Sequence, residues 1–309
     1  MNLHDKQFLA LDKTYCEFDS AAVAILPVPY EGGVSYGRGA AGAPDAILEA
    51  SAFLELYDEV LQAEPYKMGI TTISPPALPA EAENVIEAVY SLSGRLLDLG
   101  KFVVVLGGDH SITAGFFRAL SERSPASSVI QIDAHADLRD SYEGSARSHA
   151  CVMSRIREYT HNTLQIGIRS LSIEEATKIE NEQLKVCYMR DYRSGSFGVE
   201  QAIADLPDPI FITADLDAFD WSIIRSTGTP EPGGFLWHEA LDLLGLIFKQ
   251  KNVIGFDIVE LSRSESDLNS PFAAAKLLYK MLGFKLEKTV RQKSIAWPDH
   301  PSGPLFIET

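Results

Sequence analysis

The segment Val129-Ile130-Gln131-Ile132-Asp133-Ala134-His135-Ala136-Asp137 joins a short apolar run to three ionisable side chains. Its first four residues are mostly β-branched and predict a buried strand. The ionisable residues follow directly after that strand. Because alternate side chains of an extended chain share a face, Asp133, His135 and Asp137 are expected to converge.

Two other apolar runs end in the same way. Residues 102–106 continue into Gly107-Gly108-Asp109-His110-Ser111, and residues 210–214 continue into Asp215-Leu216-Asp217. In parallel α/β sheets the ligand chemistry lies at the carboxyl ends of the strands, so the three segments are expected to meet. Together they supply two imidazoles and four carboxylates as candidate metal ligands: His110, Asp133, His135, Asp137, Asp215 and Asp217.

The rest of the chain repeats this alternation of strand and helix. Short apolar runs predict strands at residues 22–26, 68–73, 102–106, 129–132, 164–168, 185–189, 210–214 and 253–259. Amphipathic stretches lie between them, including a predicted helix over residues 46–57 with Pro44 in its first turn. The alternation predicts a parallel sheet covered by helices, and the strand count fits both a closed barrel and an open sheet. No linker or repeat interrupts it, so residues 1–309 are expected to form a single domain.

The composition restricts the class of function. The 309 residues include 43 acidic and 27 basic side chains, which gives a net charge of −16, and 46% of them are hydrophobic. The hydrophobic content predicts a globular protein, and the negative charge argues against nucleic acid or an anionic membrane as partner. A cationic small molecule would be attracted instead. Three scattered cysteines, no signal-peptide pattern and no apolar run of roughly 18 residues together predict a cytoplasmic protein.

Four carboxylates in one pocket repel one another unless cations neutralise them. Two divalent ions would balance the charge, and oxygen and imidazole ligands without thiolate favour Mn²⁺, with Ni²⁺, Co²⁺ and Fe²⁺ as alternatives. A pair of ions roughly 3.5–4 Å apart could hold a bridging hydroxide at neutral pH, which predicts a hydrolase. A single Asp-x-Asp at a strand end is usually structural, but three such ends together favour a site.

In this order, the segments with the candidate ligands resemble those of the ureohydrolase superfamily of arginase, agmatinase and formimidoylglutamase. Other segments resemble the agmatinase branch, and the resemblance covers nearly the whole chain. These segments are residues 35–39 (SYGRG), 44–47 (PDAI), 148–153 (SHACVM), 165–169 (QIGIR), 228–234 (GTPEPGG) and 255–260 (GFDIVE).

The resemblance implies an open three-layer α/β/α fold with a sheet of about eight parallel strands, rather than a barrel. It also implies two Mn²⁺ ions per chain, with Asp133 and Asp215 bridging them. One ion would be held by His110, Asp133, Asp137 and Asp215, and the other by His135, Asp133, Asp215 and Asp217. A homo-oligomer, either a trimer or a hexamer, is a further implication.

The resemblance also assigns roles to Glu260 and His149. Hydroxide would attack the guanidinium carbon, and the tetrahedral intermediate would collapse to urea and an amine. Glu260 would pair with the guanidinium, and His149 would pass a proton to the departing amine. The alternatives are an ion pair of Glu260 with Arg263 or another arginine, and a capping or packing role for His149.

The implied substrate is agmatine, which would give putrescine and urea. Residues 137–140 lack the Asn-Thr with which arginases read an α-carboxylate, and the acidic balance suits a dicationic substrate. Arg147, Arg225 and Arg263 depart from the agmatinase pattern of aromatic residues and proline, so they are candidate substrate-binding residues. Either these arginines are solvated or lie at an interface while agmatine is the substrate, or at least one of them binds the carboxylate of a guanidino acid such as guanidinobutyrate.

Other substrates and other classes of protein are alternatives to this assignment. Arginine, guanidine and aminopropylagmatine are further candidate substrates for a ureohydrolase. A deacetylase shares the fold but needs one metal, so six candidate ligands argue against it. A non-catalytic subunit would not need the ligands together with His149 and Glu260.

Overall fold

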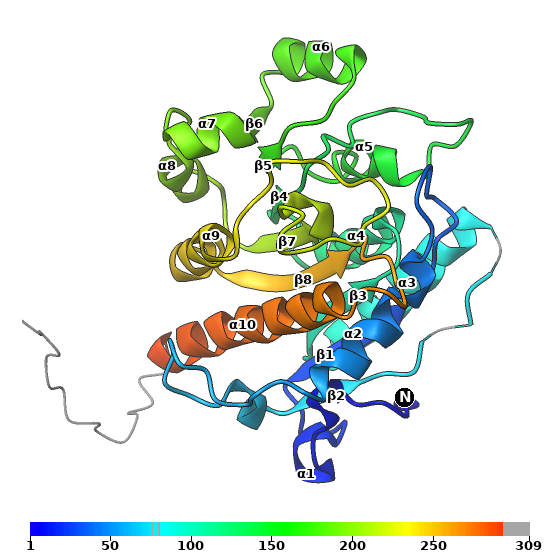
Figure 1. Ribbon diagram of the computed structural model, residues 1–309, viewed down its shortest axis with the longest axis vertical. Coiled ribbons are helices and arrows are strands. Elements are labelled where there is room, and N and C mark those ends of the chain that lie inside the picture. The colour runs from blue at the N-terminus through cyan, green and yellow to red at the C-terminus, as the bar shows by residue number, and fades with distance from the viewer. Residues whose placement is uncertain (76, 80, 293–309) are drawn as a thin grey trace, which may run out of the picture.

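The computed structural model describes residues 1–75, 77–79 and 81–292, with an eight-stranded sheet at the centre (Figure 1). Neighbouring strands pair in the order β2-β1-β3-β8-β7-β4-β5-β6, and every pair is parallel. The strands are β1 (Val23–Val28), β2 (Ile70–Thr72), β3 (Phe102–Gly107), β4 (Ser128–Ile132), β5 (Thr163–Ile168), β6 (Lys185–Tyr188), β7 (Ile210–Asp215) and β8 (Val253–Val259). Because β2 and β6 form separate edges, the sheet is open. The predicted three-layer fold is confirmed, and the barrel alternative is wrong.

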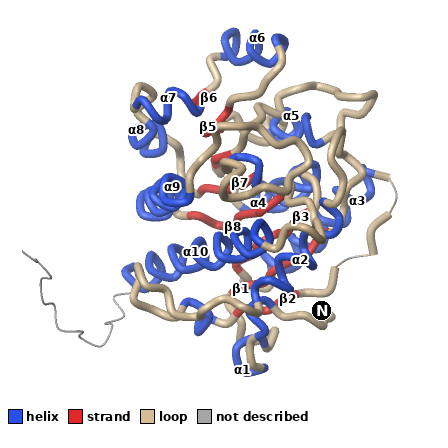
Figure 2. Tube along the Cα trace, in the orientation of Figure 1, coloured by secondary structure: helices blue, strands red, loops and turns tan. Residues whose placement is uncertain are grey.

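Helices cover both faces of this sheet (Figure 2). One face carries α2 (Ala43–Ser51), α7 (Met189–Ser194), α8 (Val199–Ala204), α9 (Trp237–Gln250) and α10 (Asn269–Gln292). The other carries α3 (Ala82–Asp98), α4 (Thr113–Arg123), α5 (Val152–Ile156) and α6 (Ile173–Glu182), while the short α1 (Lys13–Cys16) lies near β2.

Every strand except β2 contributes to two hydrophobic cores. In β3, Val104 and Leu106 pack in the core under α2, α9 and α10, whereas Val103 and Val105 pack in the core under α3 and α4. Every residue of β7 is buried. This explains why the strands are nearly continuous apolar runs, since a parallel sheet is covered on both faces.

The predicted helix over residues 46–57 is too long. Pro44 does lie in the first turn of α2, as expected, but the helix ends at Ser51. The N–H groups of Phe53 and Leu54 donate to the carbonyls of Ala50 and Ser51 at 3.1 and 3.2 Å, three residues back. These bonds tighten the last turn and satisfy carbonyls that the helix leaves free, so the chain turns away there.

The order of the central strands decides where a site can form. β3, β8, β7 and β4 are neighbours in the sheet although they are far apart in the chain. Their carboxyl ends lead to His110, Glu260, Asp215 and residues 133–137, respectively. The three segments that were expected to meet therefore do so, at one edge of the layer formed by the sheet.

A single domain over residues 1–309 remains our proposal, since residues 293–309 lie outside the described part of the chain. Within that part, none of the helices is both long enough and apolar enough to cross a membrane.

Candidate metal centre

The turn after β3 fixes the position of His110. The Asp109 N–H donates to the Tyr30 carbonyl at 2.8 Å, which holds the turn against the end of β1. A Cβ atom at Gly108 would lie 1.7 Å from the same carbonyl oxygen, so only glycine fits there. Asp109 then accepts the N–H of Ser111 at 3.0 Å and caps a 3-10 helix, His110–Ile112.

His110 faces three carboxylates. Its Nδ1 lies 3.3 Å from Asp133 Oδ2, 3.2 Å from Asp137 Oδ2 and 3.2 Å from Asp215 Oδ2. Nδ1 is buried and has no hydrogen-bond partner in the part of the chain that the structure describes, whereas Nε2 lies 2.7 Å from Thr213 Oγ1. With a proton on Nε2 for this hydroxyl, the lone pair of Nδ1 is free to bind a cation.

A second histidine faces the same cluster from the other side. His135 Nδ1 lies 2.9 Å from Asp217 Oδ2 and 3.8 Å from Asp133 Oδ1. Asp133 thus presents Oδ2 to His110 and Oδ1 to His135. Two groups of atoms close enough to hold a cation result, and Asp133 belongs to both: His110 with Asp133 and Asp137, and Asp133 with His135 and Asp217.

Burial opposes ionisation of these carboxyl groups. Burial and the charges of Asp137 and Asp217 raise the pKa of Asp133 to about 7, and burial and the neighbouring carboxylates raise that of Asp215 well above its ordinary value. Burial acts on Asp217 too, but the charge and hydrogen bond of His135 outweigh it and lower the Asp217 pKa to about 2. A cluster without cations therefore retains protons that bound cations would displace.

The donor set fits divalent cations. It combines oxygen and imidazole ligands with a buried histidine nitrogen that has no other partner, and it contains no thiolate. The three cysteines, Cys16, Cys151 and Cys187, are free and buried as expected of structural thiols. Four carboxylates would balance two divalent ions, and the shared position of Asp133 suits a bridging ligand.

Glu260 and His149 adjoin the cluster. Glu260 follows β8 with a φ of 66° and is 1% exposed. Its Oε1 accepts the backbone N–H of His110 at 2.7 Å and lies 3.2 Å from His149 Nδ1, while its Oε2 has no hydrogen-bond partner among the described residues. His149 Nε2 lies 2.9 Å from Ser35 Oγ.

These contacts answer the alternative assignments. Arg263 bonds to Glu49 at 3.0 Å, so the ion pair of Glu260 with Arg263 is absent. The His149 side chain is directed at Glu260 and Ser35 and caps no helix within the described residues.

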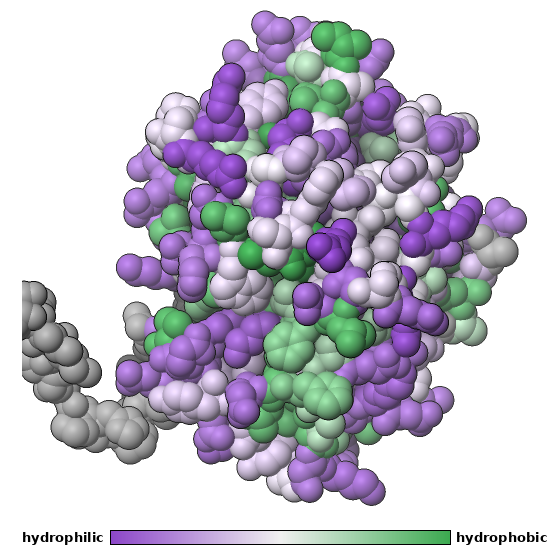
Figure 3. Space-filling view, in the orientation of Figure 1, coloured by the Kyte–Doolittle hydropathy of each residue, from purple (hydrophilic) through white to green (hydrophobic). Residues whose placement is uncertain are grey.

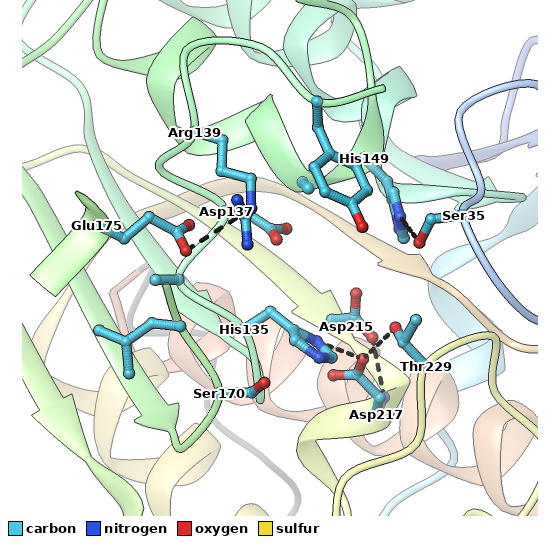
Figure 4. A pocket seen from close by; sticks show the side chains of 14 residues that line it. Ser35, His135, Asp137, Arg139, His149, Ser170, Glu175, Asp215, Asp217 and Thr229 are labelled. Atoms are coloured by element: carbon cyan, nitrogen blue, oxygen red, sulfur yellow. Dashed lines mark hydrogen bonds and ion pairs between the residues drawn. The ribbon is translucent and has the colours of Figure 1, made fainter. Parts of the chain in front are cut away.

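A cavity of about 220 Å³ opens above the cluster (Figure 4). His135, Asp215 and Asp217 lie on one side of it, and His149 approaches from the opposite side with Ser35. The other residues that line it are Ala136, Asp137, Arg139, Tyr142, Ala150, Ser170, Leu171, Glu175 and Thr229.

Comparisons with known proteins agree with this geometry. A profile of the Arginase family matches residues 21–283. The chain belongs to the arginase family. It is therefore a hydrolase that cleaves an amidino C–N bond in guanidino compounds.

Relatives of this arginase-family chain are named for two different substrates. An N(1)-aminopropylagmatine ureohydrolase from Synechocystis sp. is 40% identical over 289 residues, which cover 90% of this chain and 94% of the relative. An agmatinase from Pyrococcus horikoshii is 34% identical, over 87% of this chain and 97% of the relative. The solved structure of the agmatine ureohydrolase of Thermoplasma volcanium has a TM-score of 0.84 at 28% identity and covers 94% of this chain and 97% of that one.

The three arginines expected at the mouth of the arginase-family site lie outside the cavity. Arg147 binds Glu83 through two nitrogens, at 2.6 and 3.1 Å. Arg263 is held by Glu49 and borders a separate cavity. The Arg225 side chain is exposed, and its backbone N–H donates to Ser270. Ion pairs with distant parts of the chain account for the positions of Arg147 and Arg263.

Sequence reasoning missed a different arginine. Arg139 lines the cavity, with its guanidinium 4.8 Å from the centre of the Tyr142 ring and its Nε 3.9 Å from Glu175 Oε2. It lies in residues 137–140, a segment that the sequence analysis used only because it lacks the Asn-Thr of arginases. Glu175 is buried at the start of α6, where Ser172 and Glu175 form a capping box, so its sequence signal is that of a helix end.

We expect the metal-free protein to bind about two divalent ions per chain, measured by calorimetric titration with Mn²⁺. Asp215→Asn should weaken binding by more than the roughly 10- to 100-fold typical of losing an outer partner, because it removes an anion that faces the ligands directly. Asp109→Asn is the matched control, since the Asp109 carboxylate bonds to the N–H groups of Gly33 and Ser111 instead. Equal losses in both variants would contradict this ligand assignment.

In the metal-free protein, His149 should titrate far above an ordinary histidine. Burial opposes its protonation, but the hydrogen bond and charge of Glu260 outweigh burial and raise the His149 pKa to about 9. Since the folded pKa is raised, the stabilisation is complete below about pH 6.5 and is lost as the pH rises through about 9. An NMR titration should place the pKa there in wild type and markedly lower in Glu260→Gln. The same pKa in both proteins would contradict the coupling.

Proposed function

We propose that this chain hydrolyses agmatine to putrescine and urea at a centre of two divalent ions, with Mn²⁺ as the preferred metal and Ni²⁺ or Co²⁺ as alternatives. One observation carries the proposal. Glu260 Oε2 is a buried carboxylate oxygen without a partner, beside the candidate ligands. A buried anion of this kind needs a cation, and a guanidinium presents planar N–H groups that match a carboxylate.

The contacts of Glu260 orient it for this role. The His110 N–H and His149 Nδ1 occupy Oε1, so Oε2 is left for the substrate. A guanidinium bound there would have its carbon near the ligand cluster. Two bound ions would supply a hydroxide nucleophile at neutral pH.

His149 is placed to move a proton. Its Nδ1 is held by Glu260, and its Nε2 contacts the Ser35 hydroxyl at the wall of the cavity. Because Glu260 favours the protonated imidazole, His149 can donate a proton from Nε2 to the departing amine. Expulsion of the neutral amine from the neutral adduct then leaves protonated urea, which gives its proton to water.

The far wall of the cavity supports a cationic substrate with an alkyl chain. Leu171 and the ring of Tyr142 provide apolar surface, and Glu175 adds a carboxylate whose oxygens accept the N–H groups of Leu138 and Ser172. N(1)-aminopropylagmatine is the second candidate, because a relative with that name is 40% identical. Arg139 on this wall is the feature that favours a guanidino acid such as guanidinobutyrate.

The protein is further proposed to be a cytoplasmic homo-oligomer, a trimer or a hexamer, without nucleic acid or membrane partners. The free, buried cysteines and the net charge of −16 support the location and the absence of those partners. Figure 3 shows hydrophobic side chains gathered over the region of α2 and α10. Phe53 and Leu268 there are each 79% exposed, which supports contact with a second copy of the chain.

Kinetics of two variants should separate the roles of Glu260 and His149. Glu260→Gln should lower kcat/KM by about 10- to 100-fold through both kcat and KM, because a charge-assisted hydrogen bond contributes about 1.5–3 kcal/mol. His149→Asn should lower kcat by about 10²- to 10⁴-fold with a smaller change in KM. The exposed His161 provides a control, His161→Asn, with unchanged kinetics. Wild-type kinetics in either of the first two variants would remove that residue from the mechanism.

Urea release should identify the substrate. We expect higher kcat/KM for agmatine or N(1)-aminopropylagmatine than for guanidinobutyrate, arginine or guanidine, since Glu175 favours a cationic far end. Arg139→Ala should preserve or improve hydrolysis of the two amines, with Arg147→Ala as the control outside the cavity. A preference for guanidinobutyrate that falls at least about tenfold in Arg139→Ala would establish the guanidino acid instead.

A further inference from the structure

Two buried glutamines lie directly beneath the candidate metal centre. Gln131 is on β4 and Gln165 is on β5, in register with each other, and they are 0% and 1% exposed. Both lie among apolar residues in strands that are covered by helices. A buried amide in such a place is costly unless every polar group finds a partner, so the partners of these two side chains carry information about their role.

The partners form a chain that ends on a metal ligand. Gln165 Nε2 donates to Gln131 Oε1 and also to the Ala136 carbonyl at 2.6 Å. Gln131 Nε2 donates to Asp133 Oδ2 at 2.6 Å. An ionised carboxylate only accepts hydrogen bonds, so Asp133 requires the Nε2 side of Gln131 and thereby orients both amides. We call Gln165 and Gln131 the amide chain.

The amide chain complements a second contact on Asp133. Its other oxygen, Oδ1, accepts the backbone N–H of His135 at 2.6 Å. Each oxygen of Asp133 therefore has one protein donor and a lone pair left over. Since Oδ2 faces His110 and Oδ1 faces His135, the free lone pairs are directed at the two different groups of ligands.

We propose that the amide chain is a positioning device for the shared carboxylate: Gln131, oriented by Gln165, holds Asp133 in the one arrangement that serves both metal sites. The inference rests on the two-metal centre proposed above. It predicts that loss of the Gln131 donor weakens both ions together, because Asp133 belongs to both groups.

Thr213 provides a contrast on the same face of the sheet. It is in register with Gln131 on the neighbouring strand β7, and its hydroxyl contacts His110 Nε2 at 2.7 Å. His110 belongs to only one of the two groups. Loss of the Thr213 hydroxyl should therefore weaken one ion and spare the other.

The test is calorimetric titration of metal-free wild type, Gln131→Met, Gln165→Met, the double variant and Thr213→Val with Mn²⁺. Gln131→Met should weaken both ions by roughly 10- to 100-fold, the usual effect of an outer partner, and Gln165→Met should weaken both by less. The double variant should be no worse than Gln131→Met, because Gln165 acts through Gln131. Thr213→Val should weaken a single ion.

Gln7→Met separates positioning from general stability. The Gln7 amide also makes three hydrogen bonds, to the carbonyls of His4 and Thr72 and from the Thr72 N–H, far from the ligands. It should lower the melting temperature of the metal-free protein without changing metal affinity, whereas Gln131→Met should change affinity beyond any change in melting temperature.

The possible outcomes distinguish failure of the amide-chain inference from failure of the proposed two-metal centre. A wild-type chain that binds fewer than two ions overturns the two-metal centre and this inference with it. Wild-type affinity for both ions in folded Gln131→Met, or weakening of a single ion, overturns the amide chain alone. If Gln131→Met does not fold, Gln165→Met decides: unchanged affinity overturns the amide chain, and parallel weakening of both ions supports it.

Discussion

Mutual repulsion among four buried aspartates is the constraint on which the rest of this structure depends. Asp133, Asp137, Asp215 and Asp217 converge with no more than 7% of any of them exposed, and burial opposes the charged form of a carboxyl group. Two histidines offset part of that cost, and the remainder calls for cations. A fold that brings these groups together must therefore hold each of them by backbone that cannot relax.

The parallel sheet meets this requirement through the order of its strands. β3, β8, β7 and β4 are adjacent and buried on both faces, so their ends are as rigid as the core beneath them. The packing of Gly108 on Tyr30 ties one of these ends to β1, and Glu260 bonds to the backbone of His110 across the neighbouring strand end. Ligand geometry thus follows from strand packing, and the loops are free to serve the substrate.

Local signals made the strands and the six candidate ligands predictable. The periodicity of an extended chain is enough to interpret apolar runs that are followed by Asp and His. The number of strands fitted both a barrel and an open sheet, and the resemblance decided between them. Contacts between residues far apart in the sequence could not be predicted. The sequence around Arg147 and Arg263 does not indicate that they pair with Glu83 and Glu49. The position of Arg139 likewise depends on α6, which places Glu175 beside it. The contact between Gln131 and Gln165 could not be predicted either, because it depends on the register of β4 and β5.

Hydrolysis and substrate choice consequently rest on different parts of the molecule. The groups that would bind cations and the guanidinium come from strand ends, whereas the far wall of the cavity comes from residues 139–142 and from the start of α6. Changes in those loop residues can alter the far end of the substrate without disturbing the buried carboxylates. An N(1)-aminopropylagmatine ureohydrolase from Thermus thermophilus and an agmatinase from Pyrococcus horikoshii are each 34% identical to this chain, so overall identity does not separate the two substrate names. Under the proposed function, the few side chains around Arg139 and Glu175 would select the substrate of this chain.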